Sequence, residues 1–511
     1  MRKQKYQRIY TLDLETDPFQ HGRIPQPFVA GLYDGETFRY FWGDDCIAQA
    51  RKHIETLEPG IIYAHNGGRF DFFYTLDWMT GPMFIVANRI ISAEALGKHE
   101  LRDSFAIMPF PLKSYQKDEI NYEWMERKNR NHHRDAIVSY LQGDCVYLWN
   151  LCAEFQKRFK DRLTIGATAL SEFRKHHEFS TLTERQDRDV REEFYHGGRV
   201  ECFEKGIITS PLRVYDVNSM YPSVMRNYSH PIGMPSVIGR KITDKTAFLE
   251  VTGENLGAFT SISKTPRDTY TVTIHEWKAG LDTGMFRPQR IIKTIDFEEW
   301  STFDVFVDHF YDLRKKAKIE NDAAGILFFK YILNSCYGKF GQNPEGYKDY
   351  KIDSSGKNFA PYWTPSYIMD NFTIWSQPSR ETKRYNVAIS ASITGAARAV
   401  LMRAISQAKG LVYCDTDSLI CESMSGEIDD SKLGAWKLEE TGDTIAIAGK
   451  KMYALFRDGE CVKMASKGVK LTPEQIRLVA SGEEIIYKRD APTYRLGKGD
   501  YEFLTRKVAM T

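Results

Sequence analysis

Two aspartates, Asp415 and Asp417, directly follow an apolar strand-like run in the sequence L-V-Y-C-D-T-D-S (411–418). Residues i and i+2 of a strand project to one face, so both carboxylates are predicted to lie together on the strand or its turn. Carboxylates held this close repel each other, and a divalent cation is the usual relief. An isolated D-T-D is better interpreted as a solvated turn. Partners elsewhere in the chain therefore decide between these interpretations.

Two other segments supply such partners. Asp216 ends a strand-like run at 213–215 and is followed by V-N-S-M-Y-P. Residues 330–338 are K-Y-I-L-N-S-C-Y-G, and on a helix Lys330, Asn334 and Tyr337 share one face. That face offers a cation, an amide and an aromatic ring, which suits a nucleoside triphosphate.

Taken in chain order, the segments 216–222, 330–338 and 413–418 resemble the motifs D-x-x-S-L-Y-P, K-x3-N-S-x-Y-G and Y-x-D-T-D-S of family B DNA polymerases. Met220 stands in place of the usual leucine. The resemblance implies a DNA-directed DNA polymerase that binds template-primer DNA and dNTPs. It also implies Mg²⁺ (or Mn²⁺), two ions per active site, for in-line phosphoryl transfer at a primer 3′-hydroxyl.

The family's site residues transfer to matching positions of this chain. Those implied for catalysis and metal binding are Asp216, the Val217 carbonyl, Asp417 and, in support, Asp415. Those implied for nucleotide binding are Ser219, Tyr221, Lys318, Lys330, Asn334 and Tyr337. Tyr221 would exclude a ribose 2′-hydroxyl by its bulk, whereas a solvated helix face explains Lys318 nearly as well. Lys451 and Tyr453 resemble the K-x-Y element that contacts the primer end.

A second set of acids lies in the first 150 residues. Asp13 and Glu15 share one face of a predicted strand, and Tyr140 and Asp144 share one face of a predicted helix. With Asp71, these four carboxylates and the tyrosine can hold two metal ions and orient a hydrolytic water. Helix caps and surface acids would explain any one pair alone.

These segments resemble the three motifs of proofreading exonucleases, D-x-E, N-x2-3-F/Y-D and Y-x3-D. The resemblance implies a 3′→5′ exonuclease whose catalytic and metal-binding residues are Asp13, Glu15, Asp71, Tyr140 and Asp144. The residues implied for holding single-stranded DNA are Asn66 and, more weakly, Thr16, Tyr63, His65 and Ser104. Packing explains Tyr63 about as well.

The segment Tyr195-His196-Gly197-Gly198 resembles the Y-x-G-G linker of protein-primed enzymes from small phages and linear plasmids. Tyr195, Gly197 and Gly198 would contact DNA, and the glycines allow its close approach. Insertions at 230–302 and 343–385 resemble this subgroup's terminal-protein regions. The resemblance implies strand-displacing replication primed by a terminal protein. The alternatives are a DNA-primed repair or plasmid polymerase, or a DNA-binding relative without catalysis.

The expected fold class is multidomain α/β and α+β, with a ribonuclease H-like exonuclease domain before a right-hand polymerase. The expected parts are an exonuclease domain (1–165), a linker (166–198), a palm (199–229 and 386–481), an insertion (230–302), fingers (303–342), a second insertion (343–385) and a small thumb (482–511). Composition indicates that the second insertion is a structured loop.

Bulk composition is less informative. The 511 residues include 70 basic and 68 acidic ones, a balance that neither favours nor excludes nucleic acid. The eight cysteines form no C-x-x-C pair, so a zinc cluster is unsupported. The first six residues do not resemble a signal peptide, and no run approaches the ~18 apolar residues of a membrane helix. We therefore expect a monomeric protein without a membrane partner in the cytoplasm, the host's if it is viral or plasmid-encoded.

Overall fold

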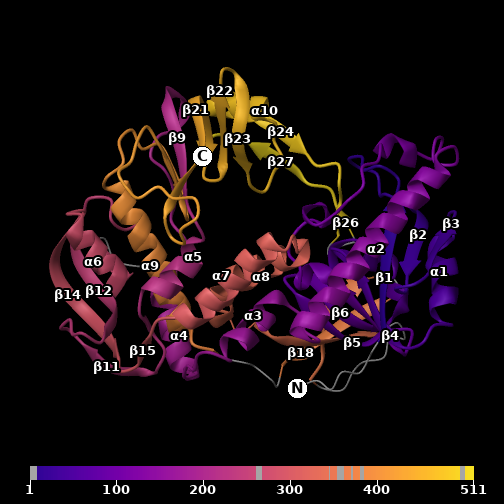
Figure 1. The fold of residues 1–511 in the computed structure, drawn as a ribbon, viewed down its shortest axis with the longest axis horizontal. Coiled ribbons are helices and arrows are strands. Elements are labelled where there is room, and N and C mark those ends of the chain that lie inside the picture. Colours follow the sequence, from indigo (N-terminus) through magenta and orange to yellow (C-terminus); the bar gives the residue numbers. More distant parts are fainter. Residues whose placement is uncertain are drawn as a thin grey trace.

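The computed structural model describes residues 8–260, 268–343, 346–353, 362–369, 372–379, 385–494, 496 and 501–511. Sheets of ten, seven and four strands lie around a central group of helices (Figure 1). This architecture agrees with the predicted multidomain α/β and α+β class. The first six residues, which carry the expectation about a signal peptide, lie outside the described ranges.

The N-terminal region forms the ten-stranded sheet, in the order β17-β18-β16-β5-β6-β7-β4-β1-β2-β3. Its strands from this region are β1 (Arg8–Thr16), β2 (Pro27–Tyr33), β3 (Phe38–Trp42), β4 (Gly60–Ala64), β5 (Met79–Val86), β6 (Arg89–Ala95) and β7 (His99–Asp103). Helix α2 (Arg134–Phe159) packs against β1 and β2. Side chains alternate along β1, so Leu12 and Leu14 enter the core. Asp13 and Glu15 therefore face the other side of the sheet, where α2 lies.

Three strands of this sheet come from the second insertion: β16 (Lys348–Asp353), β17 (Thr364–Met369) and β18 (Phe372–Pro378). Strand β16 pairs with β5, with Tyr350 opposite Met83. Ile352 and Ile374 are buried in the same core as β5 and β6. The expectation of a structured loop was therefore wrong for the described part, because its Pro- and Ser-rich segments alternate with short apolar runs that complete a sheet edge.

The seven-stranded sheet has the order β23-β22-β21-β9-β20-β19-β8, and every pairing is antiparallel. Its strands are β8 (Val200–Cys202), β9 (Gly206–Val217), β19 (Tyr413–Asp415), β20 (Ser418–Cys421), β21 (Trp436–Gly449), β22 (Met452–Arg457) and β23 (Glu460–Ser466). Strand β9 is central, and its Asp216 lies opposite both Ser418 of β20 and Lys437 of β21. Segments 200 residues apart in the chain therefore meet at one point of this sheet.

Helices α7 (Asp304–Ile319) and α8 (Ala323–Phe340) form a hairpin at the centre of the molecule (Figure 1). The turn between them places Asn321 in the left-handed region, at φ 55°. Asp322 then caps α8 by accepting a hydrogen bond from the Gly325 amide at 2.9 Å. The chain thus reverses direction between the two helices at residues 320–322.

Helix α9 (Val387–Ile405) is the one helix among the described residues that is long and apolar enough to span a membrane, and 89% of its apolar window is buried inside the protein. It packs against α6 (Ile274–Asp282) and α8. A Cβ at Gly395 would lie 2.2 Å from the Thr273 hydroxyl, so this close approach requires glycine. The burial is that of a core helix, as the small residues of this segment predict.

The C-terminal part returns to the N-terminal region. Helix α10 (Pro473–Ala480) and the pair β24 (Ile485–Lys488) and β27 (Thr505–Val508) pack on β21–β23. The short strands β25 (Thr493–Tyr494) and β26 (Tyr501–Glu502) extend from there toward α2 (Figure 1). Leu496 is buried in the core of the N-terminal sheet. Residues nearly 500 positions apart in the chain therefore share one core.

Candidate active sites

Asp216 and Asp417 face each other at the centre of the seven-stranded sheet. Asp216 is the last residue but one of β9, and Asp417 lies in the two-residue loop between β19 and β20. The Val217 amide donates a hydrogen bond to the Asp417 carbonyl at 2.8 Å. Burial, and next the nearby Asp216, raise the pKa of Asp417 to about 6. Two carboxylates that meet in this way form a site where a divalent cation relieves the repulsion.

Asp415 is held by a lysine beside this pair of acids. Strand β19 ends at Asp415, and Thr416 has a left-handed backbone at φ 61°. Asp415 accepts a hydrogen bond from Lys451 Nζ at 2.6 Å, and it is one of the groups that raise the pKa of Asp417. The structure thus brings Lys451 to the acid motif, while Tyr453 is buried against Tyr413 at a ring-centroid distance of 5.0 Å.

Sequence reasoning missed two neighbours of Asp216. Lys437 Nζ lies 3.4 Å from Asp216 Oδ1 and 2.6 Å from Glu439 Oε1. Lys463 also pairs with Glu439. The pKa of Asp216 is raised by burial and then by Glu439, and Lys437 opposes that shift. The alternation of side chains along a strand predicts that Lys437 and Glu439 share a face. Only the register of β21 against β9, however, places them next to Asp216.

The expected nucleotide-binding face of α8 lies beside these acids. Tyr337 stacks on Tyr221 with ring centroids 4.0 Å apart and an interplanar angle of 17°. Asn334 Nδ2 donates to the Lys330 carbonyl at 2.8 Å. Ser219, at φ 56°, precedes the helix α5 (Met220–Asn227) that carries Tyr221. The predicted residues of two motifs therefore meet across the α5–α8 contact.

Arg314 lies near Lys330, and the sequence alone did not predict that Arg314 belongs to this site. Partial burial, then Arg314 and Lys437, lower the pKa of Lys330. The buried Nε of Arg314 has no hydrogen-bond partner among the described residues. Lys318 lies exposed in the last turn of α7. Arg314 of α7, Lys330 of α8 and Lys437 of β21 thus lie close together, and such a group of cations suits a polyphosphate.

The second cluster of acids lines a cavity of about 450 Å³ in the N-terminal region. Oxygen atoms of Asp13, Glu15 and Asp144 lie within 4.8 Å of one another. Burial is the first cause that raises the pKa of each acid, to about 8 for Glu15 and about 7 for Asp71, and the pKa of Asp13 also rises strongly. Buried Oδ1 atoms of Asp71 and Asp144 have no hydrogen-bond partner among the described residues. These oxygens suit a hard divalent cation.

Lys117 completes this cluster and was not predicted. Its Nζ lies 3.0 Å from Asp144 Oδ2 and 5.1 Å from the centre of the Tyr140 ring. The Tyr140 hydroxyl lies 3.5 Å from that of Tyr122. Lys117 stands in a segment of short 3₁₀ turns without a periodic pattern. Only the tertiary fold connects it to the acids.

The residues expected to hold single-stranded DNA divide into two groups. Asn66 and His65 line the cavity. Asn66 accepts from Arg89 Nη2 at 2.9 Å, and both His65 ring nitrogens have partners, the Ser104 hydroxyl and the Phe110 carbonyl. Thr16, Tyr63 and Ser104 are not among the residues that line it. Thr16 is buried and donates to the Asp17 carbonyl, and Tyr63 is buried and accepts from Gln156.

Comparisons with known proteins identify the family of this chain. The model of the family "DNA polymerase type B, organellar and viral" matches residues 1–419. This chain belongs to that family. A DNA-directed DNA polymerase of Enterobacteria phage PRD1 is 43% identical over 551 aligned positions, which cover 100% of this chain and 99% of the relative. The DNA polymerase of Bacillus phage phi29 is 24% identical over 405 positions, which cover 69% of this chain and 66% of the relative.

Solved structures extend the likeness to the fold of this family B polymerase. Phi29 DNA polymerase complexed with primer-template DNA and incoming nucleotide substrates matches with a TM-score of 0.73 at 19% identity. The match covers 99% of this chain and 100% of that chain. The predicted arrangement of an exonuclease domain followed by a right-hand polymerase is thereby confirmed at the level of the fold.

The Y-H-G-G segment of the polymerase contacts the acid motif. A Cβ at Gly198 would lie 2.7 Å from the Thr416 hydroxyl, so glycine is required there. Arg398 Nη1 donates to the carbonyls of His196 and Gly197 at 2.7 and 2.8 Å, and Arg398 is itself bound to buried Glu276. The side chain of Tyr195 packs against Gly341 at the end of α8. The linker thus joins the acid motif, α8 and α9.

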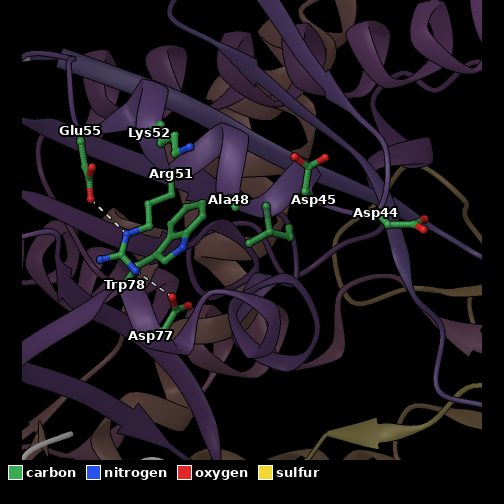
Figure 2. Close-up of a pocket in the computed structure, with 9 residues that line it drawn as sticks. Asp44, Asp45, Ala48, Arg51, Lys52, Glu55, Asp77 and Trp78 are labelled. Atoms are coloured by element: carbon green, nitrogen blue, oxygen red, sulfur yellow. Dashed lines mark hydrogen bonds and ion pairs between the residues drawn. The ribbon is translucent and has the colours of Figure 1, made fainter.

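A separate surface hollow of about 470 Å³ lies beside α1 (Cys46–Ile54) (Figure 2). Figure 2 shows Arg51 between Glu55 and Asp77, to which it donates at 3.1 and 2.8 Å. This cation is paired with acids of the same hollow. We therefore assign no chemistry to it.

Removal of divalent cations at alkaline pH should destabilise the polymerase. Because Glu15 and Asp71 have raised pKa values, the folded chain holds protons that the unfolded chain has released. Their contribution to stability is therefore greatest below the ordinary carboxyl pKa and is lost as pH rises to about 8. We expect the melting temperature in EDTA to fall from about pH 5 to about pH 8, and Asp71→Asn to raise it at the higher pH by about 1 °C for each kcal/mol of stability regained, as follows for a chain of this length. A melting temperature that rises over this interval would contradict the raised pKa values of these buried acids.

Proposed function

We propose that this chain is a DNA-directed DNA polymerase that adds dNTPs at Asp216 and Asp417 and removes 3′-terminal nucleotides at a separate site. The observation that carries the proposal is the pairing of β9 with β20. This pairing brings Asp216 and Asp417, which are distant in the chain, close together beside the cationic face of α8. The second set of acids, around Asp13, belongs to a different sheet. The two reactions are therefore independent in their residues.

The residues at Asp216 and Asp417 fit divalent cations, because both acids are partly buried and both have raised pKa values. Such ions, when bound, activate a primer 3′-hydroxyl and neutralise triphosphate charge. The chain itself would bind the triphosphate through Lys330 and Arg314. Tyr337 would stack beneath the incoming base pair.

At the exonuclease site, the oxygens of Asp13, Glu15 and Asp144 fit the same kind of ion. Tyr140 would orient the attacking water by its hydroxyl, and Lys117 would hold the scissile phosphate beside Asp144. Magnesium as the natural ion, two ions per site, a monomeric state and the cytoplasm of a host cell are further parts of this proposal.

Tyr221→Val should increase the use of ribonucleotides. The Tyr221 ring stacks on Tyr337 and would fill the space next to the sugar of an incoming nucleotide. Its removal opens that space, so we expect the ratio of kcat/KM for rNTP to that for dNTP to rise by at least about tenfold. Single-nucleotide extension assays measure it. Tyr221→Phe keeps the ring and should keep the selectivity, whereas an unchanged ratio in the valine variant would remove the steric role.

We also propose that synthesis starts on a terminal protein. The Y-x-G-G segment and the two insertions support this, and so does the 43% identity to a phage polymerase over nearly the whole chain. The first insertion, at 230–302, would contact the priming protein. The second, at 343–385, would surround the template and support strand displacement.

The test of protein priming is incubation with a candidate terminal protein, a labelled dNTP and Mg²⁺ or Mn²⁺. A protein–nucleotide adduct with the wild type and none with Asp417→Asn is expected, because the priming hydroxyl would use the polymerase site. Extension of a DNA primer without any adduct would favour the alternative of a DNA-primed enzyme. Activity in neither assay would favour the DNA-binding relative without catalysis.

A further inference from the structure

The exonuclease cavity has a wall that comes from the other end of the chain. Besides the N-terminal acids, its lining includes Lys470 and most of the segment 489–494, from Arg489 to Tyr494. We call residues 489–494 the C-terminal arm. Figure 1 shows the chain running from β24 down to β26 beside α2, where this arm lies. A site predicted within residues 1–165 is therefore completed by residues more than 300 positions later.

The arm is fixed to the exonuclease domain by aromatic contacts. The Tyr494 hydroxyl forms a hydrogen bond with the Tyr74 hydroxyl, and its ring lies 5.6 Å from Phe70 and 5.1 Å from Phe73, centroid to centroid. Tyr494 is buried. Such a cluster holds the arm in one place, since each aromatic pair adds about 0.5–1.5 kcal/mol to the burial of apolar surface.

Arg489 is held at the cavity by its own neighbours. Its Nε donates to the Ala491 carbonyl at 2.8 Å, and its Nη2 donates to the Thr493 hydroxyl. Its carbonyl lies 3.0 Å from His21 Nδ1, which connects the arm to the exonuclease domain. A guanidinium has five N–H donors in a planar fork that matches phosphate oxygens. Its position is thus set by the fold before any ligand arrives.

The charge of the cavity explains the need for such a cation. Four carboxylates in one cavity repel a nucleic-acid strand, whose phosphates are also anionic. Lys117 is bound to Asp144 and offsets part of that charge. Arg489 and Lys470 add positive charge to the lining of the same cavity. A strand that enters between the walls would then meet cations along its backbone.

We propose that the C-terminal arm is part of the exonuclease site and that Arg489 binds a backbone phosphate of the single-stranded 3′ segment a few nucleotides from the scissile bond. The inference rests on the proposed exonuclease function. Phosphate contacts of this kind position a strand without reading its sequence. The arm thus links the C-terminal module to the removal of nucleotides.

The test compares a long and a short substrate in the full-length enzyme. One is a single-stranded 15-mer oligonucleotide, and the other is the p-nitrophenyl ester of thymidine 5′-monophosphate, which has no further phosphate for the arm. For Arg489→Ala we expect kcat/KM on the oligonucleotide to fall about tenfold, and on the ester to stay within twofold. Loss of one single-strand phosphate contact should also reduce the slope of log kcat/KM against log salt by about 0.7.

Two further variants exclude a general effect of charge or folding. Lys488→Ala removes an exposed cation of the adjacent strand that does not line the cavity, and it should leave both substrates unchanged. Arg489→Lys keeps the charge and should keep the salt slope. An equal loss on both substrates, or no loss on either, would overturn the role of the arm. A wild type that degrades neither substrate would instead overturn the exonuclease assignment itself, and this inference with it.

Discussion

Asp417→Asn is expected to reduce nucleotide incorporation by at least about a thousandfold and to leave degradation of single-stranded DNA within about twofold of wild type. The change removes one of the two carboxylates that face each other between β9 and β20. A bound metal supplies several kcal/mol of transition-state stabilisation, and each 1.36 kcal/mol is about tenfold in rate. Single-turnover extension of a primer-template, with a parallel degradation assay, measures both effects. Asp216→Ala should behave alike.

The matched control is Asp430→Asn, which changes an exposed acid in the same part of the chain. It should leave both reactions unchanged. Loss of both activities in Asp417→Asn, with the control intact, would mean that the two sites are not separate. Retention of incorporation would remove Asp417 from the catalytic residues.

The double variant Asp13→Ala, Glu15→Ala is expected to show the reverse pattern. Degradation of single-stranded DNA should fall by at least about a thousandfold, because both acids supply oxygens to one cluster with Asp144. Extension should persist, since the seven-stranded sheet contains neither residue. Release of labelled nucleotide in the absence of dNTPs measures the loss, and extension of the same labelled strand on a template measures what is retained.

Asp135→Ala is the control for this pair, because it removes an exposed acid from the first turn of α2. The Asp135→Ala variant should degrade single-stranded DNA at the rate of the wild type. Persisting degradation in the double variant would refute the exonuclease assignment of this cluster. A loss of extension would show that the N-terminal domain is needed for synthesis itself.

The sequence predicted the acids well because local rules fix them. In β1, strict alternation puts Asp13 and Glu15 on one face, and in α8 the helical repeat brings Lys330 and Tyr337 to one side. Residues with a fixed spacing on one element are visible without the fold. Asp415 and Asp417 have the same spacing on the β19–β20 turn, and Asp415 is one of the groups that raise the pKa of Asp417.

What the sequence did not reveal depends on contacts between elements. Arg314 reaches Lys330 through the α7–α8 hairpin, and Lys437 reaches Asp216 through the register of β9 and β21. Lys117 and the C-terminal arm reach the exonuclease acids from segments without a periodic pattern. A single lysine or arginine belongs to no motif with a fixed spacing, so only the tertiary structure can identify it as part of a site.

The most direct measurement of the central claim is anomalous diffraction from crystals of this polymerase soaked in Mn²⁺. We expect manganese in two groups, one between Asp216 and Asp417 and the other among Asp13, Glu15 and Asp144. The first group should disappear in Asp417→Asn crystals while the second stays. Manganese in the N-terminal cluster alone, with none between Asp216 and Asp417 even in the presence of DNA and dNTP, would contradict the account of synthesis.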